Sequence, residues 1–331
     1  MPSSKSHKKI GVLLISFGTP DSTSVKDVRR FLGEFLSDGH VVSLNKLIWL
    51  PILYGPVLTF RPAKTALAYA KIWNNDANES PLRIISREQA ERLAQKFEKE
   101  NILVEWAFRY GSPSIEDKIS ALKAAGCEQL MLFALYPQNS DTTTGSAYEK
   151  SFETIIAMRD QMEIRTVRSY HNNALYIETL KSSIEDGIAS LDWEPELILS
   201  SNHSIPKPYS DAGDAYLGHI EETHALLKDA LGPQGDKLKL AFQSRFGFQE
   251  WLRPYTDDMI KEIAASGVKK IAVISPCFSA DCLETLEEIN IKYREMFLEA
   301  GGTHFHYIPC LNASPAGLSV LEDVIREHLW K

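Results

Sequence analysis

The hydrophobic positions of the chain gather into eight short runs, most of them nearly continuous in Val, Ile, Leu, Phe and Ala. Continuous apolar runs of this length are typical of strands that are buried on both faces of a parallel sheet. The pattern therefore predicts strands over residues 9–18, 104–111, 129–137, 164–170, 197–203, 238–247, 269–278 and 303–310.

Segments with helical spacing separate these runs. Residues 114–126 and 256–267 are each predicted to form a helix, and each ends in a glycine suited to the C′ position. Further helices are expected within 171–190 and about 314–330. Regular alternation of strand and helix predicts the α/β class, with parallel sheets flanked by helices.

The two halves of the chain resemble each other. FRYG…ALKAAGCEQLMLFALYP (108–137) is echoed by SRFG…EIAASGVKKIAVISP (244–276), with a glycine-terminated helix between two strands in both. This weak repeat predicts two similar βα domains with a cleft between them. We expect a first domain over 1–170 and a second over 171–313, with a C-terminal helix, 314–331, packing back on the first.

Composition narrows the class of protein. The 331 residues are 44% apolar and 24% charged, and the net charge is −8, as in a soluble globular protein with a sizeable core. The negative charge and the lack of a basic cluster argue against a nucleic-acid partner. The four cysteines form no C-x-x-C pair, so a reduced, cytoplasmic setting is the simpler expectation.

The most apolar segment is LIWLPILYGPVLTF, residues 47–60. It is shorter than the roughly 20 residues that span a bilayer, and prolines and a glycine interrupt it. The sequence leaves two alternatives open. The segment could be a buried loop-and-turn element, or an exposed apolar lip that contacts an apolar ligand or a membrane surface.

His203 is the first candidate for chemistry, because it ends a predicted strand. Ligands of open parallel sheets bind beyond the carboxyl ends of the strands, and a neutral imidazole can accept a proton or bind a transition metal. The alternative is a structural loop histidine without chemical function.

The segment FSADCLETLEEI (278–289) follows another predicted strand. On an ideal helix Asp281, Glu284 and Glu288 fall within a ~60° arc, so three carboxylates would share one face. A solvated helix face, or a cap formed by Asp281 and Glu284, would explain the same spacing. Together with His203, the carboxylates suit the handling of an Fe(II)-like metal with proton transfer.

Other signals are weaker or absent. The loop LYPQNSDTTTGS (135–146) could bind anionic oxygens or could be an ordinary polar turn. Arg109 and Arg245 could anchor carboxylates or form structural ion pairs. No dinucleotide-binding, P-loop or G-x-S-x-G motif follows any run, which argues against those classes of enzyme.

Six motifs resemble the ferrochelatases, in the Gram-negative bacterial form, and they occur in that family's order from about residue 9 to 312. They are GVLLISFGTPDS, AFRYGSPSI, LYPQNSDTTTGS, LILSSNHSIPKPYSDAGDAY, FQSRFGFQEWLRPYTDD and FSADCLETLEEI. The resemblance implies a chelatase fold of two Rossmann-like domains. It also implies insertion of Fe(II) into a free-base porphyrin, chiefly protoporphyrin IX, to give haem and two protons in the last step of haem synthesis.

The resemblance also implies roles for individual residues. His203 and Glu284 would be the catalytic pair and the metal ligands, while Asp281 and Glu288 would relay protons or iron along an acidic helix with a π-type widening. The porphyrin pocket would be lined by the 47–60 lip and by six further residues. These are Tyr136, Pro137, Ser140, Thr142, Arg109 and Tyr110.

Three positions depart from other family members. Cys282 stands where many carry a second histidine, which we interpret as a difference of lineage. Asp141 stands where cluster-bearing relatives have a cysteine, and the chain stops at Lys331 without their C-terminal cysteines. We therefore expect no iron–sulfur cluster and no permanently bound cofactor, with iron as a substrate only.

The expected partners are a porphyrin and ferrous iron, with no nucleic acid, and the oligomeric state is left open. The expected location is the cytoplasm, with peripheral contact to the inner membrane through residues 47–60. Two alternatives for the function are a cobalt or nickel chelatase of related type and a haem or porphyrin carrier. The presence of both His203 and Glu284 argues against a carrier, which would need neither residue.

Overall fold

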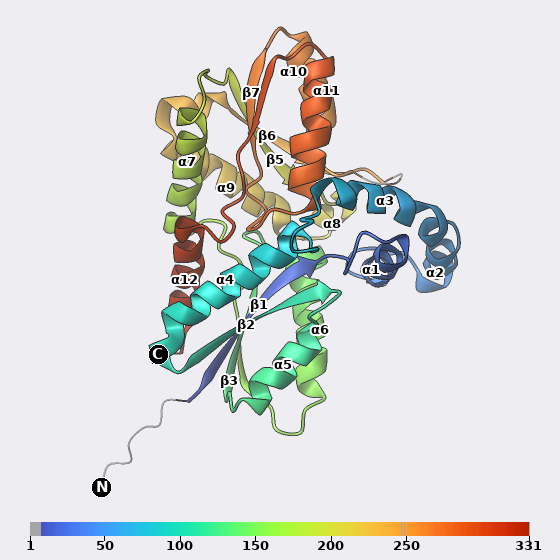
Figure 1. Cartoon of the computed structure of the whole chain (residues 1–331), viewed down its shortest axis with the longest axis vertical. Coiled ribbons are helices and arrows are strands. Elements are labelled where there is room, and N and C mark those ends of the chain that lie inside the picture. Colours follow the sequence, from blue (N-terminus) through green and yellow to red (C-terminus); the bar gives the residue numbers. More distant parts are fainter. Residues whose placement is uncertain (1–7, 246, 248, 331) are drawn as a thin grey trace. The chain divides into compact units, whose positions relative to one another are not determined.

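The structure is a computed structural model that describes residues 8–245, 247 and 249–330. The chain divides into two compact units, which Figure 1 shows in the colours of the sequence. Unit 1 comprises Met1–Leu135, Asp141–Arg168 and Leu321–Lys331, and unit 2 comprises Tyr136–Ser140 and Ser169–Val320. Each unit contains one four-stranded parallel sheet, so the predicted α/β fold class is confirmed.

The sheet of unit 1 has the strand order β2-β1-β3-β4. Its central strand β1 pairs with β2 and β3 in parallel, with Leu13 opposite both Glu105 and Leu132. The continuous apolar run of β1 is almost completely buried, because neighbours cover both of its faces. The strands are β1 (Ile10–Gly18), β2 (Ile102–Tyr110), β3 (Gln129–Ala134) and β4 (Glu163–Thr166).

The helices of unit 1 that pack against this sheet include α4 (Pro81–Phe97), α5 (Ile115–Ala124) and α6 (Ser146–Ile156). Serine side chains cap two of them, since Ser80 accepts from the Arg83 N–H and Ser114 from the Asp117 N–H. Two turns carry other helical geometry. They are the 3₁₀ turn η2 (Glu98–Glu100) and the π turn η3 (Asp141–Gly145).

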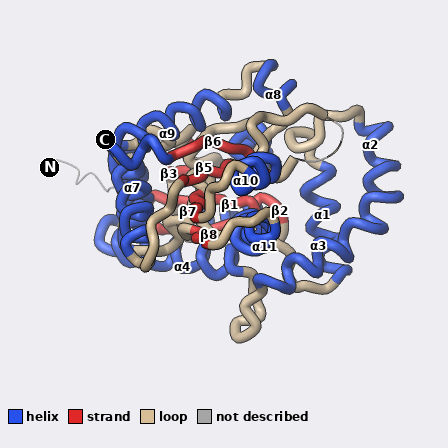
Figure 2. Tube along the Cα trace, turned by 90° about the horizontal axis from the view of Figure 1, so that it is seen from above, coloured by secondary structure: helices blue, strands red, loops and turns tan. Residues whose placement is uncertain are grey.

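The remaining helices of unit 1 are α1 (Val25–Ser37), α2 (Lys46–Ile52) and α3 (Leu58–Ile72), with the segment η1 (Leu53–Val57) between α2 and α3. Figures 1 and 2 both show α1, α2 and α3 gathered beside one another. Phe31 of α1 packs edge-on against Tyr69 of α3 at a centroid distance of 6.4 Å. The Trp49 indole of α2 donates to the Leu36 carbonyl at 2.6 Å.

Residues 47–60 thus form helix, with a break at Gly55, where the backbone leaves the helical region before Pro56. Trp49 and Leu53 are buried, but Leu47 is 86% exposed and Phe60 75%. Of the two alternatives left open for this segment, the buried loop-and-turn element is therefore wrong, because the segment is helical and the described residues leave one of its faces exposed. Among the described residues, no helix combines the length and apolarity needed to cross a bilayer.

The sheet of unit 2 has the order β6-β5-β7-β8, which repeats the topology of unit 1 strand for strand. The repeat predicted from the two similar halves is therefore present as structure. The strands are β5 (Leu197–His203), β6 (Leu238–Gln243), β7 (Lys270–Ile274) and β8 (His304–Tyr307). Strand β6 ends earlier than the predicted 238–247, and Phe246 of that prediction lies outside the described residues.

The helical elements of unit 2 are α7 (Ala174–Ala189), α8 (Lys207–Asp211), α9 (Tyr216–Ala230), the 3₁₀ turn η4 (Gly232–Lys237), α10 (Thr256–Ala265), the π-helix η5 (Glu284–Tyr293) and α11 (Arg294–Glu299). The last helix, α12 (Pro315–His328), begins in unit 2. Its second half belongs to unit 1, where Glu322 pairs with Lys96 and Arg326 with Glu100.

The core of unit 2 fixes η5 and α11 on the sheet. Ile289, Tyr293 and Phe297, spaced four residues apart, are buried with Val273 of β7 and Phe305 of β8. Helix α10 joins the same cluster, and Figures 1 and 2 both show α10 and α11 side by side. The apolar side of η5 is thus held by the core, which leaves its acidic residues on another side.

Phe297→Ala should destabilise unit 2 strongly. The side chain is fully buried, so its removal leaves a cavity worth about 3–5 kcal/mol in unfolding free energy. The neighbouring Leu298→Ala is the matched control, since Leu298 is 43% exposed and should cost below about 1 kcal/mol. Urea unfolding measures both, and equal losses would contradict the assigned core.

Candidate active site

The backbone of His203 is fixed on both sides at the carboxyl end of β5. Its N–H donates to the Cys277 sulfur at 3.2 Å, and its carbonyl accepts from the Tyr216 hydroxyl at 2.8 Å. Cys277 follows β7, the neighbour of β5, so the strand order itself brings the two residues together. Burial raises the pKa of Cys277 to about 11, so its thiol stays protonated near neutral pH.

The imidazole of His203 is held in one tautomer. Its Nδ1 lies 2.6 Å from the Ser204 carbonyl oxygen, which can only accept, so Nδ1 carries the proton and donates it. Nε2 is then the unprotonated nitrogen, and it has no hydrogen-bond partner among the described residues. The ring is half-buried, with Phe278 edge-on at a centroid distance of 6.4 Å. This arrangement suits a base or a metal ligand.

Glu284 begins the π-helix η5 and is held by its backbone. Its carbonyl accepts a hydrogen bond of 3.0 Å from the side-chain amide of Gln243, the last residue of β6. The other end of that amide accepts from the Ser201 hydroxyl of β5 at 2.6 Å. Gln243 is buried, so it joins β5, β6 and the start of the acidic helix through one side chain.

Glu288, by contrast, is held by its carboxylate. It accepts from the hydroxyls of Ser244 and Tyr293, the latter at 3.0 Å, and pairs with Lys292 at 3.2 Å. Ser244 adopts a left-handed backbone with φ of 67°, unusual for a residue other than glycine. The π-type widening implied by the resemblance is present, and it places Glu284 and Glu288 one turn apart along η5.

Asp281 does not lie on the helix, so the predicted arc of three carboxylates is wrong. It precedes η5, is buried, and accepts from Tyr307 at 2.5 Å, Thr285 at 2.9 Å and Asn312 at 2.6 Å. The helix has no side-chain cap at its N-terminus, so the alternative of an Asp281–Glu284 cap is wrong as well. Asp281 instead ties the loop before η5 to the segment after β8.

Cys282 is buried beside Glu284. Burial raises its pKa well above the ordinary value, and the Glu284 carboxylate and the Cys310 thiol raise it further. A thiol kept protonated is a poor ligand for iron, because the thiolate is the form that binds metals. All four cysteines are free, and the described residues contain no group of three or more His, Cys, Asp or Glu side chains that could hold a metal ion.

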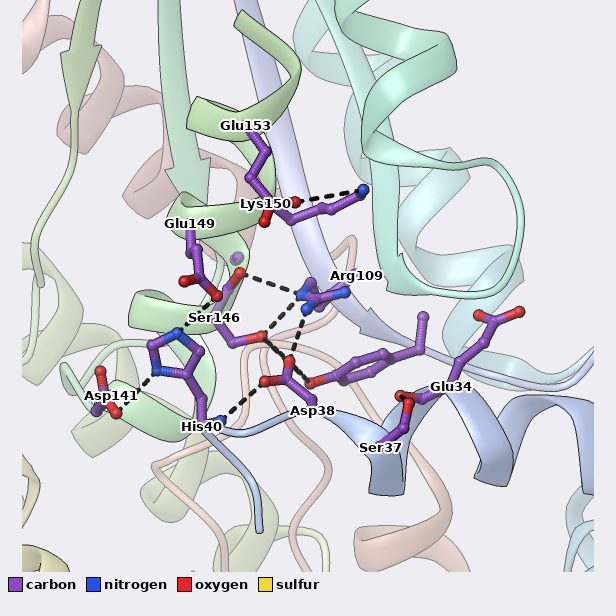
Figure 3. A network of polar contacts seen from close by, with 12 residues as sticks. Glu34, Ser37, Asp38, His40, Arg109, Asp141, Ser146, Glu149, Lys150 and Glu153 are labelled. Atoms are coloured by element: carbon purple, nitrogen blue, oxygen red, sulfur yellow. Dashed lines mark hydrogen bonds and ion pairs between the residues drawn. The ribbon is translucent and has the colours of Figure 1, made fainter. Parts of the chain in front are cut away.

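In unit 1, Arg109 belongs to the polar network of Figure 3, and the Tyr110 hydroxyl binds the same aspartate as Arg109. The buried Asp38 carboxylate accepts from Arg109 at 2.6 Å, from the Tyr110 hydroxyl at 2.7 Å and from Ser146 at 2.6 Å. Burial alone would raise the pKa of Asp38, but the hydrogen bonds from Ser146 and Tyr110 outweigh it and lower that pKa. Arg109 is thus already paired with a carboxylate of its own unit.

A second histidine closes the same network. His40 lies between Asp141 and Glu149, with each ring nitrogen 2.9 Å from a carboxylate oxygen (Figure 3). Burial lowers the pKa of His40, but the hydrogen bonds to these two carboxylates outweigh that effect and raise the pKa overall. The contacts tie the turn after α1 to η3 and α6, next to Thr142.

The other predicted pocket residues lie in Tyr136–Ser140, which belongs to unit 2. There the Pro137 carbonyl accepts from the Tyr170 N–H at 3.0 Å, and Ser140 donates to Asp214 at 2.9 Å. Arg245, the other predicted anchor, pairs with Asp257 and Asp258 and lies over the Tyr255 ring, so it forms structural ion pairs.

The sequence did not point to Gln243, Ser244, Cys277 or Tyr216. Gln243 and Ser244 fell inside a strand predicted to continue to residue 247. A polar pair at the end of an apolar run could have marked the strand end, since β6 stops at Gln243. Tyr216 contacts His203 from a helix 13 residues further along the chain, and no local pattern predicts such a contact.

Comparisons with known proteins identify the family of the chain. The family model described as Ferrochelatase matches residues 9–329. A curated ferrochelatase from Allorhizobium ampelinum is 51% identical over 97% of this chain and 94% of its own, and one from Rhizobium meliloti is 50% identical over 97% and 95%.

A solved structure supports the same fold at much lower sequence identity. The sirohydrochlorin chelatase SirB from Bacillus subtilis subspecies spizizenii, in complex with cobalt, matches with a TM-score of 0.54 and 9% identity over 96% of this chain and 94% of its own. The chain therefore belongs to the ferrochelatase family, and it is an enzyme that inserts iron into a porphyrin in haem synthesis.

Proposed function

We propose that His203 is the base that removes the two pyrrole N–H protons of the porphyrin. The observation that carries this role is that Nε2 of His203 has no hydrogen-bond partner among the described residues. Its Nδ1, its backbone N–H and its carbonyl are each held by a hydrogen bond. A base that is held in one tautomer and one orientation is positioned to accept a proton from a bound substrate. Each turnover consumes one Fe(II) and one free-base porphyrin and releases haem and two protons.

We propose that Glu284 acts with His203 at the metal or the pyrrole nitrogens. The contact from Gln243 fixes its backbone, while its side chain makes no ion pair with any described residue. An oxygen ligand that is positioned but not neutralised can receive Fe(II), and together with the His203 nitrogen it gives a mixed N/O ligand set suited to that ion.

Of the two residues expected to relay protons or iron, we retain Glu288 and set Asp281 aside. Glu288 is partly exposed and lies one turn from Glu284, so it can exchange a proton or an ion with solvent. The two oxygens of Asp281 are buried and already accept hydrogen bonds from three side chains. We assign Asp281 a structural role that holds the start of η5.

For the substrate, we propose protoporphyrin IX, bound by Tyr136, Pro137, Ser140, Thr142, Arg109 and Tyr110. The six residues include one cation, Arg109, and Asp38 already neutralises it. They therefore offer no unpaired positive charge to a porphyrin with additional carboxylates, such as coproporphyrin. The same pairing suggests that Arg109 shapes the pocket instead of anchoring a carboxylate.

We further propose that the protein is cytoplasmic and contacts the inner membrane peripherally through residues 47–60. Leu47, Ile48 and Phe60 are exposed on neighbouring helical segments of unit 1. Exposed apolar side chains of this density are typical of surfaces that meet a partner or a membrane. A porphyrin is itself poorly soluble in water, so membrane contact would favour its uptake from the bilayer.

His203→Ala should abolish iron insertion and leave the thermal melting curve within a few degrees of wild type. The loss is expected because the alanine side chain offers no nitrogen to accept the protons. His304→Ala, at an exposed position on β8, is the matched control and should retain activity. Steady-state kinetics with Fe(II) and protoporphyrin IX measures both, and turnover near the wild-type rate in His203→Ala would end the proposed role.

Glu284→Gln should affect catalysis, whereas Asp281→Asn should affect stability. Glu284→Gln should lower kcat at least tenfold with little change in the porphyrin KM or in thermal stability, since it removes a charge needed at the reacting centre. Asp281→Asn should instead lower stability by about 1–3 kcal/mol, because an amide cannot accept at both of its ends. Kinetics beside urea unfolding separates the two, and the reverse pattern would exchange the assigned roles.

Replacing Leu47, Ile48 and Phe60 together by Ser should weaken binding to vesicles of phosphatidylethanolamine and phosphatidylglycerol. Each exposed apolar side chain inserted into the interface contributes about 1–2 kcal/mol, so binding should fall by at least tenfold. Ile156→Ser changes an exposed residue of α6 and should bind like wild type. Vesicle sedimentation gives the answer, and unchanged binding of the triple variant would refute the membrane contact.

A further inference from the structure

In unit 2, α9 and the turn before it hold the segment that precedes η3. Side chains of this helix and turn bind three consecutive residues of Tyr136–Ser140, so this part of the segment follows the helix. The contacts are Gln138 Nε2 to Thr223 Oγ1 at 3.0 Å, Asn139 N to His219 Nδ1 at 3.1 Å and Ser140 Oγ to Asp214 Oδ2 at 2.9 Å.

The central contact of this set depends on an imidazole. The backbone N–H of Asn139 is the donor, so Nδ1 of His219 must be the unprotonated acceptor. The His219 ring is stacked on the ring of His171, with centroids 3.7 Å apart and planes within 6°. His171 in turn lies 2.9 Å from the Glu222 carboxylate, so α9 and the loop before α7 hold the ring in one orientation.

We infer that His219 is a positioning residue for porphyrin binding, acting through the main chain of residues 136–140. The inference rests on the proposed function, in which Tyr136, Pro137 and Ser140 contact the porphyrin. The Asn139 N–H lies between those pocket residues in sequence, and His219 is the group that satisfies it. Without this acceptor a half-buried amide would be left unpaired, and the segment would shift or loosen.

This role predicts an effect on binding and not on chemistry. His219 is not placed at the reacting atoms, so its loss should raise the porphyrin KM and leave kcat within about twofold. The expected size of the rise is roughly two- to tenfold, which corresponds to one neutral hydrogen bond. The KM for iron should stay unchanged, because the iron-handling residues proposed above lie on other elements.

Two substitutions at His219 separate its two contacts. His219→Phe keeps an aromatic ring for stacking on His171 but removes the acceptor, whereas His219→Asn keeps an acceptor at the position of Nδ1 and removes the ring. The three residue types have similar helix propensity, so α9 itself should not be weakened. The matched control is His224→Phe on the same helix, whose Nδ1 has no hydrogen-bond partner in the structure.

The expected result is a raised porphyrin KM in His219→Phe, with His219→Asn and His224→Phe close to wild type. A raised KM in His219→Asn but not in His219→Phe would show that stacking matters and the acceptor does not, which would overturn the inference. Equal effects of His219→Phe and His224→Phe would overturn it too, since they would reflect the helix as a whole.

Tyr136→Ala tests the underlying pocket separately. If it raises the porphyrin KM while His219→Phe does not, the proposed pocket is supported and the positioning role of His219 is wrong. If neither substitution changes the KM, residues 136–140 do not bind the porphyrin and the inference falls with the pocket.

Hydrogen exchange provides a further test, and its first measurement is made on the wild-type enzyme alone. The peptide that contains Asn139 should be protected in the wild type, and in His219→Phe it should exchange faster at unchanged global stability. Exchange of this peptide at the rate of an exposed loop in the wild type would overturn the inference.

Discussion

The candidate site depends on one buried side chain, the amide of Gln243. Its oxygen accepts from Ser201 in β5 at 2.6 Å and its nitrogen donates to the Glu284 carbonyl at 3.0 Å, while its own backbone ends β6. An unpaired buried amide group costs about 1–3 kcal/mol, so neither contact can be given up cheaply. The end of β6, the strand that carries His203 and the start of the acidic helix are therefore locked together.

The same site is one half of an internal repeat. In both units the third strand in chain order, β3 or β7, leads through a short loop into a π turn, η3 or η5, and then into an α-helix. In unit 1 the turn is bound by His40 and carries the candidate pocket residue Thr142. In unit 2 it carries Glu284 and Glu288. The same sequence of strand, π turn and helix thus places side chains at the carboxyl end of the sheet in each unit, and these side chains differ in chemical type between the units.

The strands and His203 could be predicted from sequence because local patterns determine them. All eight runs became strands, and the central ones, such as β1 and β3, were the clearest because a strand buried on both faces shows as a continuous apolar run. His203 ends such a run, that of β5. The acidic helix was placed wrongly because its start depends on distant residues. Asp281 binds Tyr307 and Asn312, which are 26 and 31 residues away, and these contacts keep it off the helix. The pairing of Arg109 with Asp38 could not be predicted either, because the two residues are 71 positions apart in the sequence.

Two of the three carboxylates of η5, those of Glu284 and Glu288, belong to residues that are constrained at different atoms. The Gln243 side chain holds the backbone carbonyl of Glu284, so the position of the residue is set without an ion pair to its carboxylate from any described residue. Ser244, Tyr293 and Lys292 hold Glu288 by the carboxylate itself, so its charge is partly compensated. A carboxylate that receives a cation must first lose any donor already bound to it. The arrangement of Glu284, which is held through its backbone, therefore suits this task better. A carboxylate that only passes ions or protons onward can keep such donors, as Glu288 does. The two constraints come from adjacent residues at the end of β6, Gln243 and Ser244. The end of one strand therefore sets how both Glu284 and Glu288 are held, and this supports the different roles proposed for them.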